Sequence, residues 1–346
     1  MIAEALVMPP RKKKEGKEMK YIGLDVHKEY IHGTVLDESG RVMKSGKFKY
    51  AKEGFEEFFQ ELGKAKVAME AGYCWQPCYE LLEDMGHDVS LAHPLKTRLI
   101  ADVKIKTDAK ASEALAQLLL MGWLPTSYVP PEDIRRLREL VRLREYLVNI
   151  QTRFKNKVHS ALMKEGIRGQ RGIFAKKRRG LLQSFEIDEV NRCVSILDVL
   201  DKHIRELSAM IKSIAGESQE AKWFMSIQGV GYYSAVAVLA EIGDVSRFSD
   251  PEKLCAYAGL VPSTQESGGK SAHGKITHQG SPILRWVLIE CVWNHLINAE
   301  DTSLTRFFHR VARNRGKQKA AVATARKLLK VMYVLLKEKR EFRDFR

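Results

Sequence analysis

Three acidic residues stand where a carboxylate is costly unless it is paired or binds a cation. Asp25 comes near the end of the apolar run 21–26, and Glu70 comes near the end of the apolar run 67–71. Both runs have the length and composition of buried strands, and an unpaired charge there lowers stability. Asp108 follows a lysine-rich approach and begins an amphipathic stretch, so the head of this helix could hold a metal or a phosphate. The alternative for Asp108 is a simple helix N-cap.

The segment 20–123 that carries these acids is predicted to alternate strands and helices. Three strands as an antiparallel meander, followed by β-α units, is the order of a ribonuclease-H-like fold. That fold places the acids of its first and fourth strands side by side at one sheet edge. The expected strands are 21–26, 31–37, 41–50, 67–71 and 88–92, with helices around Phe55 to Leu62 and over 77–85.

Three short motifs around these acids resemble a known family. They are Gly23-Leu-Asp-Val-His-Lys28, Met69-Glu-Ala-Gly72 and Lys106-Thr-Asp108. In this order they are similar to motifs of the DEDD transposases of the insertion-sequence one-hundred-ten family, a group that includes the DNA invertases of pilin genes. The resemblance implies a RuvC-like domain over residues 20–128 that binds Mg²⁺ (or Mn²⁺) through four acids. Asp25, Glu70 and Asp108 match three of them.

The fourth acid of the family has no counterpart here. The family places Asp three residues after the aspartate of the Lys-Thr-Asp motif, and this chain has Ala111 there. Positions i and i+3 share a helix face, so two carboxylates at that spacing can share one metal site. Glu113 lies five residues after Asp108, about 140° around a helix, and is a poor substitute. The chain is therefore expected to be catalytically impaired, whether Ala111 is natural or introduced.

Positive charge is concentrated in three blocks of the sequence. The net charge is +15; residues 134–180 hold fifteen Lys or Arg and three acids, and residues 305–346 hold fourteen and three. A smaller block, 9–20, lies in a tail, 1–19, that is expected to be flexible. A basic block is often only a solvated surface, but three blocks of this density favour a polyanion, and nucleic acid is the commonest.

The segment 129–216 is predicted to form an antiparallel coiled-coil arm with a basic tip. Leucine and isoleucine recur at spacings of three and four residues on both sides of the tip. An intramolecular hairpin without a partner and a dimer contact are both compatible with this pattern. The first helix is expected to use Leu140, Leu143, Leu147, Ile150 and Phe154. The tip includes Arg168, Arg171, Lys176, Lys177, Arg178 and Arg179, and its few aromatic residues favour contact with phosphates over stacking on bases.

The segment 217–346 is predicted to be a mostly helical domain. Ile227-Gln-Gly-Val-Gly231 before an apolar helix is similar to a helix-hairpin-helix, in which Gly229 and Gly231 let backbone N–H groups approach a phosphate. The alternative is a tight turn between two helices. Residues 305–346 are expected to form a basic helix whose charges face nucleic acid.

A second possible reactive group lies in this C-terminal segment. Ser267-Gly-Gly-Lys270, with Tyr257-Ala-Gly-Leu-Val-Pro262 before it, closely resembles the C-terminal signature of the same family. The resemblance implies that Ser267 is a nucleophile that becomes covalently joined to DNA. Lys270, Lys275 and Arg285 are nearby cations that could stabilise phosphate charge. Without the resemblance, a serine before two glycines is an ordinary loop residue.

Other classes of protein are disfavoured by composition. The chain of 346 residues has no run of about eighteen apolar residues, so no membrane span is expected. Its start lacks the features of a secretory signal. Cys74 and Cys78 have no second pair at zinc-site spacing, so buried or free thiols in a reducing cytoplasm are expected.

The resulting hypothesis is a transposase or recombinase of an insertion sequence. The resemblance implies guidance by a structured bridge RNA that pairs with donor and target DNA, and a homo-oligomer in which the acidic domain and the serine are brought together between protomers. One alternative is a RuvC-like junction nuclease that uses metal-activated water. Another is a transposase-derived nucleic-acid-binding protein without activity, with which Ala111 is consistent.

Overall fold

The computed structural model describes residues 19–100, 107–168, 172–175, 178–267, 270–276 and 279–344. All of the predicted flexible tail except Met19, together with Arg171, Lys176 and Lys177, therefore lies outside the described residues. The chain divides into two compact units, Met1–Val129 and Pro130–Arg346, and the basic arm and the C-terminal helices belong to the same unit.

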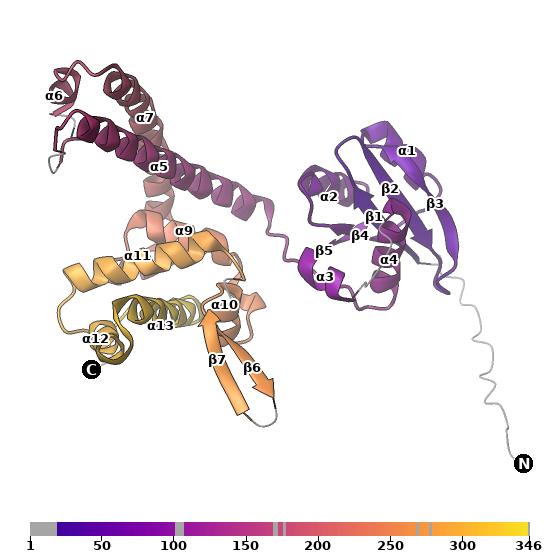
Figure 1. Ribbon diagram of the computed structural model, residues 1–346. Coiled ribbons are helices and arrows are strands. Elements are labelled where there is room, and N and C mark those ends of the chain that lie inside the picture. The colour runs from indigo at the N-terminus through magenta and orange to yellow at the C-terminus, as the bar shows by residue number, and fades with distance from the viewer. Residues whose placement is uncertain are drawn as a thin grey trace, which may run out of the picture. The chain divides into compact units, whose positions relative to one another are not determined.

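The first unit is built on a five-stranded sheet with the order β3-β2-β1-β4-β5 (Figure 1). β1 pairs antiparallel with β2, and β2 with β3, whereas β4 is parallel to β1 and to β5. This arrangement confirms the predicted meander followed by parallel strands. The strands are β1 (Lys20–Val26), β2 (Tyr30–Leu36), β3 (Val42–Lys49), β4 (Ala65–Glu70) and β5 (Asp88–Ala92).

The two faces of the sheet are covered by different helices. Successive side chains of a strand point to opposite faces, so Ile22 and Leu24 share one face while Gly23 and Asp25 share the other. The first face packs against α1 (Lys52–Phe59) and α2 (Trp75–Asp84), where the aromatic residues of α1 complete the main apolar core. The acids predicted on β1 and β4 therefore lie on the face that α1 and α2 leave free.

Helix α4 (Asp108–Leu120) covers that second face and contacts β1, β2 and β4. Its residue Leu115 packs with Ala68 and Ala92 in a small apolar cluster. The N-cap of α4 is Thr107, whose side chain accepts a hydrogen bond from the Lys110 N–H. Asp108 is thus the first residue of the helix rather than its cap, and its carboxylate is available for other contacts. The short helix α3 (Pro94–Ile100) precedes it and buries none of its residues.

The second unit begins with a long helical hairpin made of α5 (Glu132–Lys164) and α7 (Asp188–Glu217), joined through the short α6 (Arg179–Gln183). Three contacts fix an antiparallel arrangement: Arg144 with Ser208, Gln151 with Asp201, and Lys157 with Glu189. A separate apolar cluster at the far end includes Leu162, Ile173 and Leu182. Supercoiling of the pair and its role in a dimer stay predictions.

The prediction that Leu143 packs between the two helices of the arm is wrong. Leu143 is 49% exposed, whereas Val141 is fully buried in the core of the second unit. A spacing of three and four residues predicts one apolar face on α5, but α5 packs against α9 as well as α7. Val141 is therefore buried although it lies outside the predicted set.

The remaining helices enclose the largest apolar core among the residues that the structure describes. They are α8 (Gln219–Met225), α9 (Tyr232–Ile242), α10 (Pro251–Tyr257), α11 (Pro282–Asn298), α12 (Ser303–Arg315) and α13 (Lys317–Glu338). The single basic helix expected over 305–346 is wrong, because α12 and α13 are separate helices that meet at Gly316. Its φ of +80° is one that glycine adopts readily and that a helix cannot continue through.

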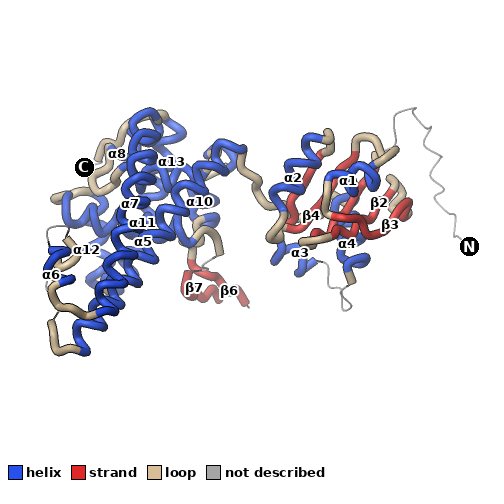
Figure 2. Tube along the Cα trace, turned by 90° about the horizontal axis from the view of Figure 1, so that it is seen from above, coloured by secondary structure: helices blue, strands red, loops and turns tan. Residues whose placement is uncertain are grey.

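A two-stranded antiparallel hairpin, β6 (Pro262–Ser267) with β7 (Lys270–Ile276), extends from these helices (Figure 2). These two strands were not predicted, because a mostly helical domain was expected over 217–346. Among the residues that the structure describes, no helix is both long enough and apolar enough to cross a bilayer.

Candidate functional site

The register of the sheet sets Asp25 beside Glu70. Leu24 of β1 pairs in parallel with Met69 of β4, so the next residue of each strand is an acid. Both acids lie on the face covered by α4, because they occupy alternate positions to the core residues Leu24 and Met69. The first turn of α4 then brings Asp108 to the same edge.

One hollow collects all the positions predicted to form the acidic site. Asp25, Glu70, Asp108 and Ala111 all line it, together with Thr107 and Arg98. Glu113 is not among its lining residues, and its carboxylate accepts a hydrogen bond from Gln117 one turn further along α4. The methyl group of Ala111 therefore occupies the place on α4 from which a fourth carboxylate would reach the hollow.

Beside the hollow, a close group of potential ligand atoms includes His27, which was not among the predicted site residues. Atoms of Asp25, His27 and Asp108 all lie within 4.8 Å of one another. His27 Nε2 is 3.3 Å from Asp25 Oδ2 and 3.6 Å from Asp108 Oδ1. Glu70 lines the same hollow but is outside this group, and its Oε1 is 3.9 Å from Arg98 Nη2. The structure thus brings two of the three predicted acids into close contact and keeps the third at the rim.

The Asp108 carboxylate is held from one side by two other side chains. Tyr30 Oη donates a hydrogen bond to Oδ2 over 3.1 Å, and Lys47 Nζ lies 3.0 Å from the same oxygen. The hydrogen bond from Lys47, supported by that from Tyr30, holds the pKa of Asp108 below its usual range, and the same contact raises the pKa of Lys47. Asp108 is therefore a stable anion with Oδ1 turned toward His27.

A buried polar network fixes α4 against β2. The hydroxyl of Ser112 lies 2.9 Å from His32 Nδ1 and 2.8 Å from Thr34 Oγ1, and it donates to the Ala109 carbonyl. All three side chains are at least 90% buried. Burial lowers the pKa of His32, so the ring favours its neutral form. The network holds the first turns of α4, and with them Asp108, in a defined place on the sheet.

The donor set fits a hard divalent cation. Carboxylate oxygens are the protein ligands that Mg²⁺ prefers, and Mn²⁺ accepts both oxygen and imidazole nitrogen. Two carboxylates and one imidazole already converge, and Glu70 lines the same hollow. The arrangement can therefore hold one divalent ion at the edge of the sheet.

Ser267, the predicted nucleophile, is the last residue of β6. It pairs with Lys270, the first residue of β7, so the two strands are joined across Gly268 and Gly269. Lys275 lies further along β7. Ser267 and Lys270 are thus paired on the hairpin, whereas Lys275 lies next to Ile276, which pairs with Pro262 at the opposite end of the two strands. The roles assigned to these residues stay predictions.

Arg285, the third predicted cation, is engaged at the base of the hairpin. Its Nη1 donates to the carbonyl oxygens of Ala258 and Gly280. Partial burial lowers its pKa. These contacts tie the segments before and after the hairpin to α11, which gives Arg285 a structural task independent of any phosphate.

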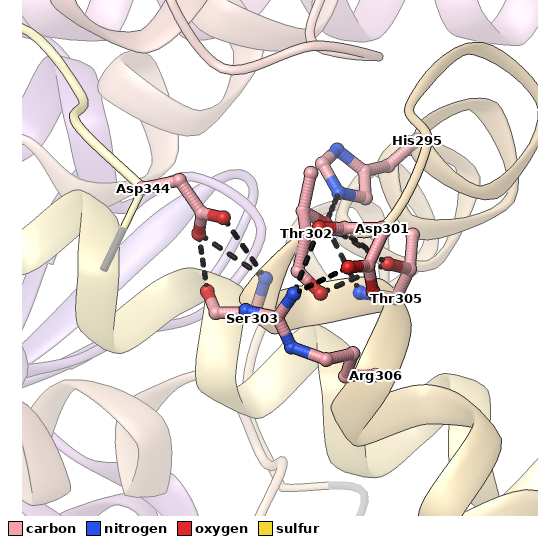
Figure 3. Close-up of polar contacts among 7 residues, drawn as sticks. All are labelled: His295, Asp301, Thr302, Ser303, Thr305, Arg306 and Asp344. Atoms are coloured by element: carbon pink, nitrogen blue, oxygen red, sulfur yellow. Dashed lines mark hydrogen bonds and ion pairs between the residues drawn. The ribbon is translucent and has the colours of Figure 1, made fainter. Parts of the chain in front are cut away.

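Gly229 in the helix-hairpin-helix-like segment has a packing explanation. A Cβ atom at this residue would lie 2.4 Å from the backbone nitrogen of His295, and its φ is +87°. His295 Nδ1 also lies 2.6 Å from the Gln228 carbonyl oxygen, while Nε2 lies 2.7 Å from Thr302 Oγ1 in the capping box of α12 (Figure 3). The loop is therefore packed against α11, and His295 of α11 links it to the N-cap of α12. Gly231 has open space around its α-carbon and is the N-cap of α9.

The basic tip of the arm is described in part. Arg168 and Arg178 are exposed, and Arg179 is the first residue of α6. Lys176 and Lys177, two further residues of the predicted phosphate site, lie outside the described residues.

Four residues near the acids were not predicted from the sequence: Tyr30, Lys47, Arg98 and His27. Tyr30 and Lys47 come from β2 and β3, and only the sheet register brings them to Asp108. For His27 a signal existed, because an imidazole two residues after an acid in an extended segment points to the same side, and histidine is the commonest metal ligand.

Comparison with known proteins gives a consistent result over most of the chain. Residues 22–165 match the DEDD model of IS110 transposases, and residues 221–308 match the model described as Transposase IS116/IS110/IS902 family. The transposase for insertion sequence element IS1111A of Coxiella burnetii is 26% identical, over 96% of this chain and 94% of its own. A putative transposase, y4qE, of Sinorhizobium fredii is 25% identical over 93% and 89%. A probable family 20 transposase of Pseudomonas aeruginosa is 26% identical over 91% and 96%.

Proposed function

The chain belongs to the IS110 family of DEDD transposases, and from this we propose that it exchanges DNA strands to move an insertion sequence, guided by a bridge RNA. Donor DNA and target DNA are the substrates, and the RNA pairs with both. The observation that carries the proposal is the shared hollow of Asp25, Glu70, Asp108 and Ala111 at one edge of a ribonuclease-H-like sheet.

The acidic hollow is the proposed phosphate-activating site. Asp25, Glu70 and Asp108 would hold Mg²⁺ or Mn²⁺, which supplies charge stabilisation to a phosphodiester under attack. Tyr30 and Lys47 keep the Asp108 carboxylate ionised and oriented. Arg98, 66% exposed beside Glu70, is a cation that a DNA phosphate could contact at the rim.

Ser267 is the proposed nucleophile. Its hydroxyl oxygen attacks a DNA phosphorus atom, the phosphoserine ester forms, and one DNA hydroxyl leaves with a proton. Attack by a hydroxyl of a second DNA strand reverses the step, forms the new phosphodiester and restores the serine. Each step exchanges one phosphate ester for another, so no outside energy source is required. We propose that the acidic site and the serine act together within a homo-oligomer.

Two nucleic-acid partners are supported by the distribution of charge. The block 134–180 lies on the arm and its tip, and the block 305–346 covers α12, α13 and the C-terminal residues. Arg168 and Arg178 at the tip and Gly231 before α9 remain proposed contacts with phosphate. Binding by these blocks should weaken steeply as salt rises, because each neutralised phosphate releases counterions.

The deciding experiment is capture of a protein–DNA adduct. The chain with Asp at position 111 is incubated with a supercoiled donor, target DNA and the element's RNA, and the products are separated under denaturing conditions. Ser267→Ala should abolish both the adduct and recombination while leaving DNA binding intact. Ser271→Ala, on the partner strand of the same hairpin, is the matched control and should retain both.

The two alternatives predict other outcomes. A junction nuclease would cut DNA without an adduct and would not need Ser267. A nucleic-acid-binding protein without activity, which Ala111 favours, would bind DNA and RNA but give no product with either residue at position 111.

A further inference from the structure

His27 lies on the same side of the chain as Asp25, because side chains alternate between the two sides of an extended segment. It follows Asp25 by two residues, just beyond the end of β1 at Val26. Residues i and i+2 of an extended chain point to the same side. The imidazole therefore lies on the same side as the Asp25 carboxylate, 3.3 Å from its Oδ2.

The distances around His27 Nε2 are those of ligands that share one ion. Ligand atoms about 2.1 Å from a cation are about 3.0 Å apart at an octahedral angle and about 3.4 Å apart at a tetrahedral angle. The observed separations of His27 Nε2 are 3.3 Å to Asp25 Oδ2 and 3.6 Å to Asp108 Oδ1. The first separation falls within this range and the second slightly exceeds it, so both are near the spacing of ligands on one cation.

The ring and the carboxylate are oriented by the same tyrosine. The His27 imidazole stacks on Tyr30 with ring centroids 4.7 Å apart and planes 29° apart. The Tyr30 hydroxyl and Lys47 hold Asp108 Oδ2, so Oδ1 faces the imidazole. Such support of ligands by neighbouring groups is typical of metal sites.

We propose that His27 is a direct ligand of the divalent cation and gives it a nitrogen donor, in a site that lacks a fourth carboxylate at Ala111. The inference rests on the proposed metal site and adds a donor of a different chemical class to it. It gives the site a preference among ions. Imidazole binds Mn²⁺ and the later transition metals better than Mg²⁺, whereas carboxylates and water suit Mg²⁺ and Mn²⁺ alike.

An alternative role for His27 is a simple ion pair with Asp25. That role needs a protonated imidazole and no cation, and the 3.3 Å contact alone does not separate the two. Coordination by nitrogen has a signature that an ion pair lacks, because a bound ¹⁴N nucleus couples to the unpaired electrons of Mn²⁺.

The test uses the full chain as it stands, with Mn²⁺ alone as the probe. Pulsed electron paramagnetic resonance measures ¹⁴N coupling, and a titration measures Mn²⁺ affinity with Mg²⁺ as competitor. His27→Phe keeps the stack on Tyr30 and removes the donor atom. His203→Gln, an exposed histidine of α7, is the matched control, and Asp25→Asn removes an acid.

The expected result is a ¹⁴N coupling in the unchanged chain and in His203→Gln that disappears in His27→Phe. Mn²⁺ affinity should fall by about tenfold or more in His27→Phe, the loss seen when even an outer partner of a metal site is removed, and Mg²⁺ affinity should fall less. Mn²⁺ binding that depends on Asp25 but shows no coupling from His27 would overturn the inference and leave the acidic site standing. Absence of any Asp25-dependent binding would overturn the proposed metal site as well.

Discussion

Gly23 of β1 lies directly beneath Ser112 of α4, and a Cβ atom on Gly23 would fall 1.9 Å from the Ser112 carbonyl oxygen. The same atom would lie 2.6 Å from the Ala116 backbone nitrogen. The strand that carries Asp25 and the helix that carries Asp108 therefore approach each other backbone to backbone. This contact determines how far apart the two carboxylates lie.

Gly23→Ala is expected to separate the acids and weaken metal binding. The added methyl group meets backbone atoms that cannot rotate away, so α4 must move, at a cost of about 1–3 kcal/mol in the free energy of unfolding. Thermal denaturation and Mn²⁺ titration measure the two effects. Gly46→Ala, in β3 with open space around its α-carbon, is the control. Unchanged Mn²⁺ affinity in Gly23→Ala would show that the close approach does not set the site.

Much of the acidic site could be predicted from the sequence because strand periodicity is a local property. Asp25 and Glu70 end apolar runs, and the order of strands places them on neighbouring parallel strands. His27 could have been included on the same grounds. Lys47 could not, since only the register between β2 and β3 brings it to Asp108, and that register depends on pairings distant in sequence.

The C-terminal unit was less predictable because its contacts join residues far apart. The glycine pattern at 229 and 231 resembles a phosphate-binding turn, yet the backbone of α11 packed on Gly229 explains that residue equally well. Arg285 shows the same ambiguity, because a cation near a functional motif can instead cap backbone carbonyls. The hairpin β6–β7 was missed since its strands are short and polar, with no apolar alternation to mark them.

Arg142 is expected to be the most important cation of the arm for stability. It donates two hydrogen bonds to the carboxylate of Glu241 in α9, whose side chain is only 1% exposed. Arg142→Ala leaves that buried charge without its partner, so we expect a loss of about 3 kcal/mol in the free energy of unfolding.

Arg136 offers a matched control on the same helix. Its ion pair with Glu132 is exposed on both sides, and such pairs contribute less than about 1 kcal/mol. Denaturant unfolding of Arg136→Ala and Arg142→Ala measures the difference. Equal losses would mean that Glu241 is solvated or neutral in the folded protein.

Glu252 is expected to make stability depend on pH in the acidic range. It links α10 to α13 by ion pairs with Lys330 and Arg326, and the hydrogen bonds from these two residues hold its pKa below the usual glutamate range. A carboxyl group with a lowered folded-state pKa stabilises the protein above its unfolded-state pKa. This contribution is lost as pH falls through the folded-state value.

Glu252→Gln should therefore lower the melting temperature at pH 7 by about 1–3 °C, and the difference from the unchanged chain should close below about pH 4. Calorimetry across this range measures both quantities. Glu139→Gln, an exposed glutamate of α5, is the control. A difference that persists undiminished at pH 3 would show that the pair does not act through its charge.

Ala111→Asp is expected to convert a weakly active or inactive chain into an active transposase. Ala111 is exposed and lines the hollow one helical turn from Asp108, so an aspartate fits there without displacing packed atoms. The missing carboxylate need not prevent ion binding, because Mg²⁺ usually keeps several waters. Without this carboxylate the ion should move from its catalytic position, and a displacement of about 1 Å can lower the rate on the order of 100-fold.

The measurement is the amount of recombination product across a Mg²⁺ titration, for the unchanged chain and Ala111→Asp side by side. Ala109→Asp adds the same charge to the first turn of α4 at a position that does not line the hollow, and it should not restore activity. Equal activity of the unchanged chain and Ala111→Asp would mean that another group, His27 first among them, already completes the site. If both are inactive while nucleic acid still binds, the binding-protein alternative is favoured, because the acidic site then lacks more than one carboxylate.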